Sequence, residues 1–251
     1  MLRSFLCSSL FLLSSCGGVV LETLPQPTSA ENLLLIVHGS GDTPDDWPKR
    51  LRAAIVNFYD ENETWDLWTY DWDVYASSRT TASSDGLILG ALLGEALLVE
   101  PYVYKHIHLV GHSVGSYVIH ALAEKVSNRN ADITLHATYL DPFTANGFLD
   151  WSYGQREFGR YADYAENFYN KDDPVPSTNE ILEHAHNFDV TALRSKAYDP
   201  DKLHWWPTDF YIDSVGQATQ QGYAHAHQII DEGITALKES FPQGEETVLE
   251  K

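Results

Sequence analysis

A serine between two glycines is the residue of this chain best suited to covalent chemistry. The motif Gly111-His112-Ser113-Val114-Gly115 follows an apolar run at 107–110 and opens a helical pattern at 114–126. A serine at such a strand-to-helix turn projects from a tight bend, so the positions two before and two after it must lack side chains. The helix behind the turn points its N–H groups at developing negative charge. Ser113 is therefore the candidate nucleophile.

A second loop could complete the same site. The segment His38-Gly39-Ser40-Gly41 directly follows the apolar run at 33–37. The tetrahedral intermediate of acyl transfer carries negative charge on oxygen, which two preorganised N–H groups stabilise. We expect the backbone N–H groups of Ser40 and Val114 to form this oxyanion hole. The other interpretation of residues 38–41 is a tight turn that only ends a strand.

Both motifs need strands that end at a common edge. Short apolar or aromatic runs predict strands at 33–37, 65–72, 107–110, 133–140, 165–169 and 187–193. Helical spacing predicts helices at 45–59, 86–98, 114–126 and 222–237. Strands that alternate with helices indicate one α/β domain, with a mainly parallel sheet covered by helices on both faces. We place this domain at residues 32–240, followed by an acidic tail at 241–251.

Three segments together resemble the α/β-hydrolase family, on its lipase and esterase side. They are LLLIVHGSGD from residue 33, HLVGHSVGS from residue 108, and a late histidine before the aromatic helix start at 205–211. The resemblance covers residues 32–240. It implies an eight-strand-type sheet, a serine–acid–histidine triad in that chain order, and hydrolysis of esters without a cofactor.

The resemblance directs the search for a general base to a histidine late in the chain. His184 and His186 precede the last predicted strand, and His225 and His227 fall in the last predicted helix. His204 alone lies in a polar loop after that strand, where the family places its histidine. We therefore expect His204 to be the base. A capping or surface role is its alternative.

Two aspartates follow predicted strands and could hold the imidazole in the right tautomer. Asp141, in Leu140-Asp141-Pro142, looks like the acid of those lipase branches that place it one strand early. Asp173 follows the next predicted strand, the commoner location in the family. It stands, however, in a doubled, proline-rich acidic run that is typical of an exposed turn. We favour Asp141 as the triad acid and keep Asp173 as the alternative.

The composition limits other functions. The 251 residues include 36 acidic and 16 basic ones, and a net charge of −20 disfavours nucleic-acid binding. Hydrophobic residues make up 43%, which excludes a disordered chain, and two cysteines exclude a disulfide framework or a cysteine-built zinc site. The chain has neither a Walker-type phosphate loop nor a His-Glu-x-x-His helix, so we expect no metal and no cofactor.

The N-terminus resembles a bacterial lipoprotein signal peptide, which we place at residues 1–15. Its apolar run is shorter than the roughly 20 residues that cross a bilayer. Leu13-Ser14-Ser15-Cys16-Gly17 resembles a lipobox, which implies cleavage before Cys16 and lipidation of that cysteine. Residues 16–31 would then tether the domain to the membrane, at the outer membrane or facing the periplasm. Secretion behind an ordinary signal peptide is the alternative.

The substrate class depends on less specific segments. Residues 87–99 and 143–161 could line an acyl pocket or form a lid, but we expect core helices. The resemblance implies a small-molecule or lipid ester as the substrate. The same triad would serve an acyltransferase, a thioesterase or a peptidase. A catalytically inactive, lipid-anchored binding protein would share the fold.

Overall fold

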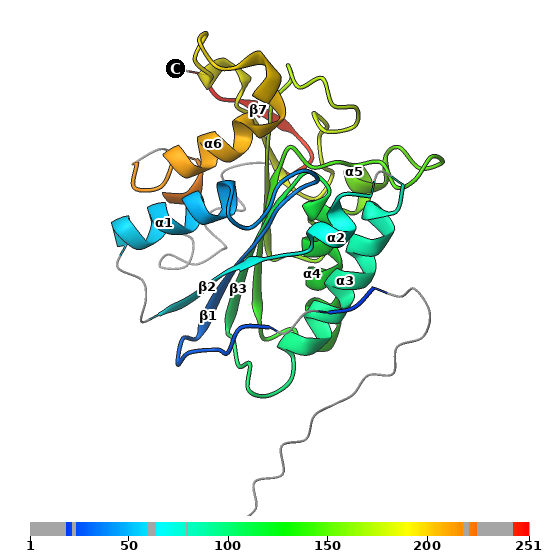
Figure 1. Ribbon diagram of the computed structural model, residues 1–251, viewed down its shortest axis with the longest axis vertical. Coiled ribbons are helices and arrows are strands. Elements are labelled where there is room, and N and C mark those ends of the chain that lie inside the picture. Colours follow the sequence, from blue (N-terminus) through cyan, green and yellow to red (C-terminus); the bar gives the residue numbers. More distant parts are fainter. Residues whose placement is uncertain are drawn as a thin grey trace, which may run out of the picture.

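Seven parallel strands form the centre of the molecule (Figure 1). The computed structural model describes residues 19–21, 24–59, 64–78, 80–217, 221–224 and 243–250. Within these residues the strand order is β2-β1-β3-β4-β5-β6-β7, and every neighbouring pair runs parallel. The expected α/β architecture is confirmed, with seven strands in the described part of the chain where the resemblance implies an eight-strand type.

The described elements follow the predicted alternation closely. The strands are β1 (Asn32–Val37), β2 (Trp65–Tyr70), β3 (His106–His112), β4 (Thr134–Leu140), β5 (Tyr164–Tyr169), β6 (His186–Asp189) and β7 (Glu246–Val248). The α-helices are α1 (Trp47–Tyr59), α2 (Asp73–Ala76), α3 (Ala82–Leu97), α4 (Gly115–Arg129), α5 (Tyr153–Glu157) and α6 (Trp206–Asp213). Two short 3₁₀-helices, η2 (Thr191–Leu193) and η3 (Pro200–Trp205), precede α6.

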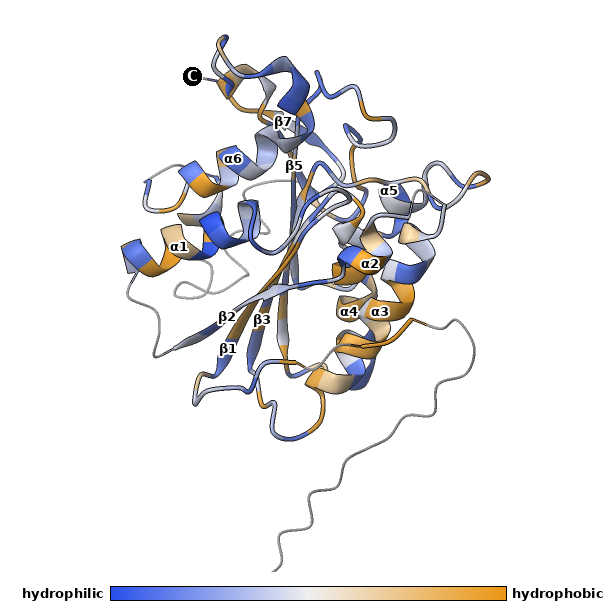
Figure 2. Cartoon of the chain, in the orientation of Figure 1, coloured by the Kyte–Doolittle hydropathy of each residue, from blue (hydrophilic) through white to orange (hydrophobic). Residues whose placement is uncertain are grey.

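The sheet is buried on both faces, which explains the continuous apolar runs of its central strands. Successive side chains of a strand point to opposite faces. Leu33, Leu35 and Val37 therefore join the core on the α3 and α4 side, and Leu34 and Ile36 join the core on the α1 and α6 side. Figure 1 shows these two helical layers on either side of the sheet, and Figure 2 shows the apolar centre that they enclose.

Glycines allow α3 to lie close against α4. Gly86, Gly90 and Gly94 are four residues apart, so they share one face of α3. A Cβ atom at Gly90 would lie 2.1 Å from the carbonyl oxygen of Val118, a separation that no real Cβ atom adopts. The backbone of α3 therefore rests on the backbone of α4, the helix that follows Ser113.

The C-terminal part differs from the sequence-based expectation. The strand predicted at 187–193 ends at Asp189, where the chain turns into η2. Residues 246–248, within the expected acidic tail, form β7 and pair with β6, so the sheet extends beyond residue 240. Of the helix predicted at 222–237, residues 225–237 lie outside the described residues. Short α2 and α5 carry too few apolar repeats to be predicted.

The parallel sheet brings the candidate site residues to one edge. The turns that follow β1, β3, β4 and β5 carry Ser40, Ser113, Asp141 and Asp173 in that order. Because these strands are parallel, their carboxyl ends lie together. Loops of four separate segments can therefore meet around one substrate.

Replacing Gly90 by Ala should destabilise the protein, although the same change in an ordinary helix interior is favourable by about 1 kcal/mol. The new methyl group would push α3 away from α4, and overpacking of this kind costs about 1–3 kcal/mol. Urea unfolding measures the difference. Ile88→Ala, at a half-exposed position of the same helix, serves as the control and should have a smaller effect. Equal or greater stability of Gly90→Ala would contradict the close packing.

Candidate active site

Ser113 lies in the tight turn between β3 and α4, with a φ of 53°. This left-handed conformation is uncommon for a residue with a side chain. A Cβ atom at Gly115 would lie 2.6 Å from the carbonyl oxygen of His38, and one at Gly111 would lie 3.1 Å from the Gly115 backbone. Both glycines are therefore required sterically. The predicted strand–turn–helix setting of Ser113 is confirmed.

The loop after β1 packs directly against this turn. A Cβ atom at Gly39 would lie 2.8 Å from the Cβ atom of Ser113, so the two backbones approach as closely as glycine allows. Trp72 holds the loop in place, because its Nε1 donates a hydrogen bond of 2.8 Å to the carbonyl oxygen of His38. This packing brings Ser40 to the cavity beside Ser113.

A cavity of about 320 Å³ adjoins the candidate nucleophile. Ser113, Ser40 and Val114 all line it, so the two expected oxyanion residues and the serine share one space. Most of the remaining lining is apolar. Residues 143–161 supply much of it from a loop and do not form the expected core helix, since only α5 is helical there. The lining residues from this segment are Phe143, Ala145, Gly147, Phe148 and Trp151.

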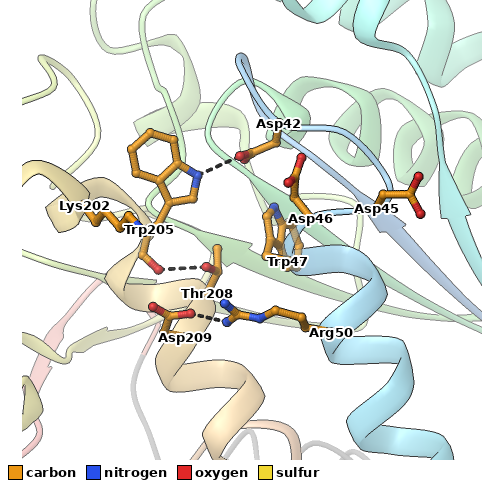
Figure 3. Close-up of a pocket in the computed structure, with 9 residues that line it drawn as sticks. All are labelled: Asp42, Asp45, Asp46, Trp47, Arg50, Lys202, Trp205, Thr208 and Asp209. Carbon is orange, nitrogen blue, oxygen red and sulfur yellow. Dashed lines mark hydrogen bonds and ion pairs between the residues drawn. The ribbon is translucent and has the colours of Figure 1, made fainter. Parts of the chain in front are cut away.

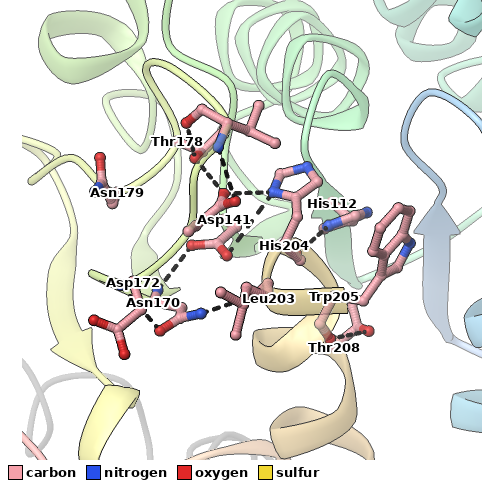
Figure 4. A network of polar contacts seen from close by, with 12 residues as sticks. His112, Asp141, Asn170, Asp172, Thr178, Asn179, Leu203, His204, Trp205 and Thr208 are labelled. Atoms are coloured by element: carbon pink, nitrogen blue, oxygen red, sulfur yellow. Dashed lines mark hydrogen bonds and ion pairs between the residues drawn. The ribbon is translucent and has the colours of Figure 1, made fainter. Parts of the chain in front are cut away.

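His204 faces two carboxylates from the neighbouring loops (Figure 4). Its Nδ1 atom lies 2.7 Å from Oδ2 of Asp173 but 3.9 Å from Oδ2 of Asp141. Only the first distance is that of a hydrogen bond. The structure thus joins His204 to Asp173, and this geometry does not support the preference for Asp141 as the partner of the histidine.

The loop after β5 explains why Asp173 reaches the imidazole. Its proline-rich run lies in an exposed turn, as expected, but the Asp173 side chain within it turns inward and is only 6% exposed. The amide of Val175 donates to Oδ1 of Asp173 at 3.0 Å, and the hydroxyl of Thr178 donates to Oδ2. Asp141 accepts at its Oδ1 from the amide of Asn170 at 2.9 Å. The two aspartates are therefore held at different distances from His204.

Sequence comparison assigns this architecture to a known family. The family described as alpha/beta hydrolase fold matches residues 32–199, which is well over half of the chain. The chain belongs to the α/β-hydrolase family. This membership supports a hydrolase activity and agrees with the parallel sheet and the serine turn.

Solved structures similar to this α/β-hydrolase are distant in sequence. One is the product of the gene lin2722 from Listeria innocua, 14% identical, with a TM-score of 0.45 over 70% of this chain and 93% of that chain. Another is LpqC, a poly(3-hydroxybutyrate) depolymerase from Bordetella parapertussis, 13% identical, with a TM-score of 0.39 over 89% of this chain and 75% of that chain. No curated protein matches the sequence.

Burial and neighbouring charges shift the pKa values of the two carboxylates in opposite directions in this α/β-hydrolase. Burial, together with the charge of Asp173, raises the pKa of Asp141 well above its usual range. Burial alone would also raise the pKa of Asp173, but the hydrogen bond and charge of His204 and the hydrogen bonds from Thr178 and Val175 together lower it. Burial, followed by the charge of His112, lowers the pKa of His204. These directions favour an ionised Asp173, a protonated Asp141 and a neutral His204.

This protonation pattern suits proton abstraction. Nδ1 of His204 carries the proton that it donates to Asp173, so the neutral ring keeps a free electron pair on Nε2. A ring of this tautomer can accept a proton from a hydroxyl group and return it later.

The residues that hold these loops escaped prediction. Asn170 donates from its backbone to Asp141 and from its side chain to the carbonyl oxygen of Leu203 at 2.9 Å, which ties the β5 turn to the His204 loop. Thr178 orients Asp173. The position of Asn170 directly after a predicted strand is the only sequence signal for it, and Thr178 has none.

Two groups of potential metal ligands occur in the described part of the chain, each with ligand atoms within 4.8 Å of one another. One is Asp141, Asp173 and His204, where a cation would bind Nδ1 of His204 and so replace its hydrogen bond to Asp173. The other is His108, His136 and Glu166, in which the two imidazoles are stacked with centroids 3.8 Å apart and planes 3° apart. Nitrogen electron pairs of parallel rings run side by side and do not converge on one ion, so we assign a metal to neither group.

The two aspartates should respond differently to conversion to Asn. Asp173→Asn removes the negative charge and replaces one acceptor oxygen by an amide donor, so the His204 tautomer is no longer fixed, and the rate at which a fluorophosphonate labels Ser113 should fall on the order of 10³-fold or more. Asp141→Asn mimics the protonated acid and should leave the rate near that of the wild type. Labelling followed by intact-protein mass spectrometry measures both rates. The reverse ranking would return the triad role to Asp141.

Proposed function

We propose that this α/β-hydrolase cleaves carboxylic esters through Ser113, His204 and Asp173. The observation that carries the proposal is the 2.7 Å bond between His204 and a buried carboxylate on the same edge of the sheet as the serine turn. A neutral imidazole fixed in one tautomer, at the same edge of the sheet as a serine in a left-handed turn, can activate a hydroxyl nucleophile.

The proposed reaction has two halves. His204 accepts the proton of Ser113 as the serine oxygen attacks the ester carbonyl, and the same proton then goes to the departing alcohol. Water repeats the attack on the acyl-enzyme and releases the acid. The backbone N–H groups of Ser40 and Val114 bind the oxyanion in both halves, and each such donor contributes about 3 kcal/mol to the transition state.

Asp173 stabilises the imidazolium that forms in each half-reaction. Its charge lies against Nδ1 of His204, whereas Asp141 stays neutral and hydrogen-bonded to the amide of Asn170. A second ionised carboxylate in this buried space would repel the first. We therefore propose Asp173, the alternative of the sequence analysis, as the triad acid.

The cavity beside Ser113 favours an ester with an apolar acyl group. Its lining is mostly apolar, with Phe143 and Val175 inside and Trp151 at the margin. The loop that supplies this lining carries exposed apolar side chains at its tip, namely Phe148 and the fully exposed Leu149. Apolar surface that is continuous from the cavity to the loop tip would hold an acyl chain and shield the reacting ester from water.

Replacing Ser113 by Ala should abolish hydrolysis of p-nitrophenyl esters and leave the fold unchanged, because the reaction needs the hydroxyl while the turn does not. Circular dichroism and urea unfolding check the fold. Ser83→Ala, in the lining of the same cavity, is the matched control and should retain most of the activity. Undiminished turnover by Ser113→Ala would refute the nucleophile. Product analysis with competing alcohols, thiols or amines tests whether water is the acceptor.

We also propose that Cys16 carries a lipid that holds the protein at the outer membrane or facing the periplasm. The proposal depends on the lipobox-like sequence, which lies outside the described residues. No helix among the described residues is long and apolar enough to span a bilayer. The large negative charge would repel anionic lipid head groups, so attachment would depend on the acyl chains.

Metabolic labelling with radioactive palmitate in a bacterial host tests the anchor. The wild type should incorporate label, and Cys16→Ser should not, because it removes the acylated thiol. Cys7→Ser changes the other cysteine of the chain, in the part expected to be removed, and should label normally. Label retained by Cys16→Ser would refute lipidation at this position.

A further inference from the structure

His112, the residue before the candidate nucleophile, lies between two hydrogen-bond acceptors. Its Nε2 is 3.0 Å from the carbonyl oxygen of His204, and its Nδ1 is 3.3 Å from Oδ2 of Asp42. The ring is fully buried, and the Asp42 side chain is 7% exposed. The ring nitrogens of His112 are therefore shielded from solvent.

The protons at this site can be counted from the chemistry of the partners. A carbonyl oxygen only accepts, so Nε2 of His112 must carry a proton. An ionised carboxylate also only accepts, so Nδ1 must carry one as well. The exception would be a protonated Asp42, but the hydrogen bond that Oδ1 accepts from Nε1 of Trp205 favours the ionised carboxylate. Burial raises the pKa of Asp42, and the hydrogen bonds and charges around it, taken together, lower it below the usual value.

We propose that His112 is an imidazolium paired with Asp42, and that this pair positions the His204 loop and places a fixed positive charge beside the His204 ring. The catalytic consequence rests on the proposed function, whereas the charge of His112 does not. Both members are positioning residues, since neither lies at the cavity that holds Ser113.

Asp42 connects three loops of the site (Figure 3). It follows β1 in the same loop as Ser40, it pairs with His112 of the serine turn, and its Oδ1 accepts a hydrogen bond of 2.8 Å from Nε1 of Trp205. Trp205 directly follows His204. One buried carboxylate therefore links the oxyanion loop, the nucleophile turn and the histidine loop.

The positive charge acts on His204 at short range. The ring centroids of His112 and His204 are 4.6 Å apart, and a cation at this distance opposes protonation of the neighbouring imidazole. Asp173 acts in the opposite direction at Nδ1, Asp42 does so from farther away, and Asp141 is neutral. Trp47 and Trp205 flank His112 without charge.

The surroundings of Asp42 do not supply another counter-charge at hydrogen-bond distance. On its outer side it borders a cavity of about 410 Å³. The other charged residues of that cavity are Asp45, Asp46, Arg50, Lys202 and Asp209, and Arg50 is already paired with Asp209 (Figure 3). His38, which acts electrostatically on Asp42 more weakly than His112 does, faces Asp71 at 3.8 Å.

Asp42→Asn separates charge from hydrogen bonding. The amide oxygen would still accept from Trp205, and the amide nitrogen would donate to a neutral His112 at Nδ1, so every hydrogen bond survives while both charges disappear. If the pair of His112 and Asp42 had only a structural role, the pKa of His204 in Asp42→Asn would equal that of the wild type. The proposal predicts that the pKa of His204 rises.

The acid limb of the pH dependence of kcat/KM for an ester reports this pKa, because only the neutral base is active. In Asp42→Asn the acid limb should move to higher pH by about one unit. At pH values above the limb, kcat/KM should change little. Asp45→Asn removes an exposed carboxylate from the same outer cavity and should not move the limb. His112→Gln, which keeps a donor for the His204 carbonyl, should move it in the same direction.

¹⁵N NMR of the histidine-labelled full chain tests the charge without any substrate. Both ring nitrogens of His112 should be protonated at pH 8 in the wild type, and one should lose its proton in Asp42→Asn. A neutral His112 in the wild type, or an unmoved acid limb in both variants, would overturn the proposal. Absence of ester turnover in the wild type would contradict the proposed function alone, and the NMR result would still decide the charge.

Discussion

The left-handed turn at Ser113 is the constraint on which the rest of the site depends. A Cβ atom at Gly39 would meet Ser113, and one at Gly115 would meet the backbone at the end of β1, so the β1 loop lies directly against the serine turn. Ser40 consequently faces the same cavity as the serine. The close contact of α3 with α4 supports the turn from behind, because α4 begins at Gly115. Backbone packing thus fixes the relative positions of Ser40 and Ser113.

In the buried space behind the turn, the acidic side chains do not all carry a charge in the proposed mechanism. Three carboxylates and two imidazoles lie within a short distance, an arrangement that would repel strongly if all acids were ionised. Asp173 keeps its charge through His204 and Asp42 through His112, while Asp141 remains protonated. In the proposed mechanism this division leaves one neutral base that faces a hydroxyl, with a counter-charge on its far side.

Local patterns predicted the fold and the centres of the motifs well. The apolar runs at 33–37 and 107–110 are strands because their residues alternate between two buried faces. The strand at β7 was missed because three residues that include Glu246 carry no apolar signal and are held only by pairing with β6. Local patterns also did not indicate that Asp173 bonds His204, because the proline-rich acidic run is largely exposed and only Asp173 turns inward to Thr178 and His204.

The sequence by itself determined the α/β class, the turn around Ser113 and the loop at Ser40, because each depends on neighbours in the chain, and the family resemblance directed the choice of His204. Only the tertiary structure decided which carboxylate meets His204, that residues 143–151 line a cavity, and that Asp42 joins three loops. These are contacts between segments 30 to 160 residues apart. The distances from Nδ1 of His204 to the two carboxylates, 2.7 Å and 3.9 Å, depend on how these segments pack, and no spacing along the chain encodes them.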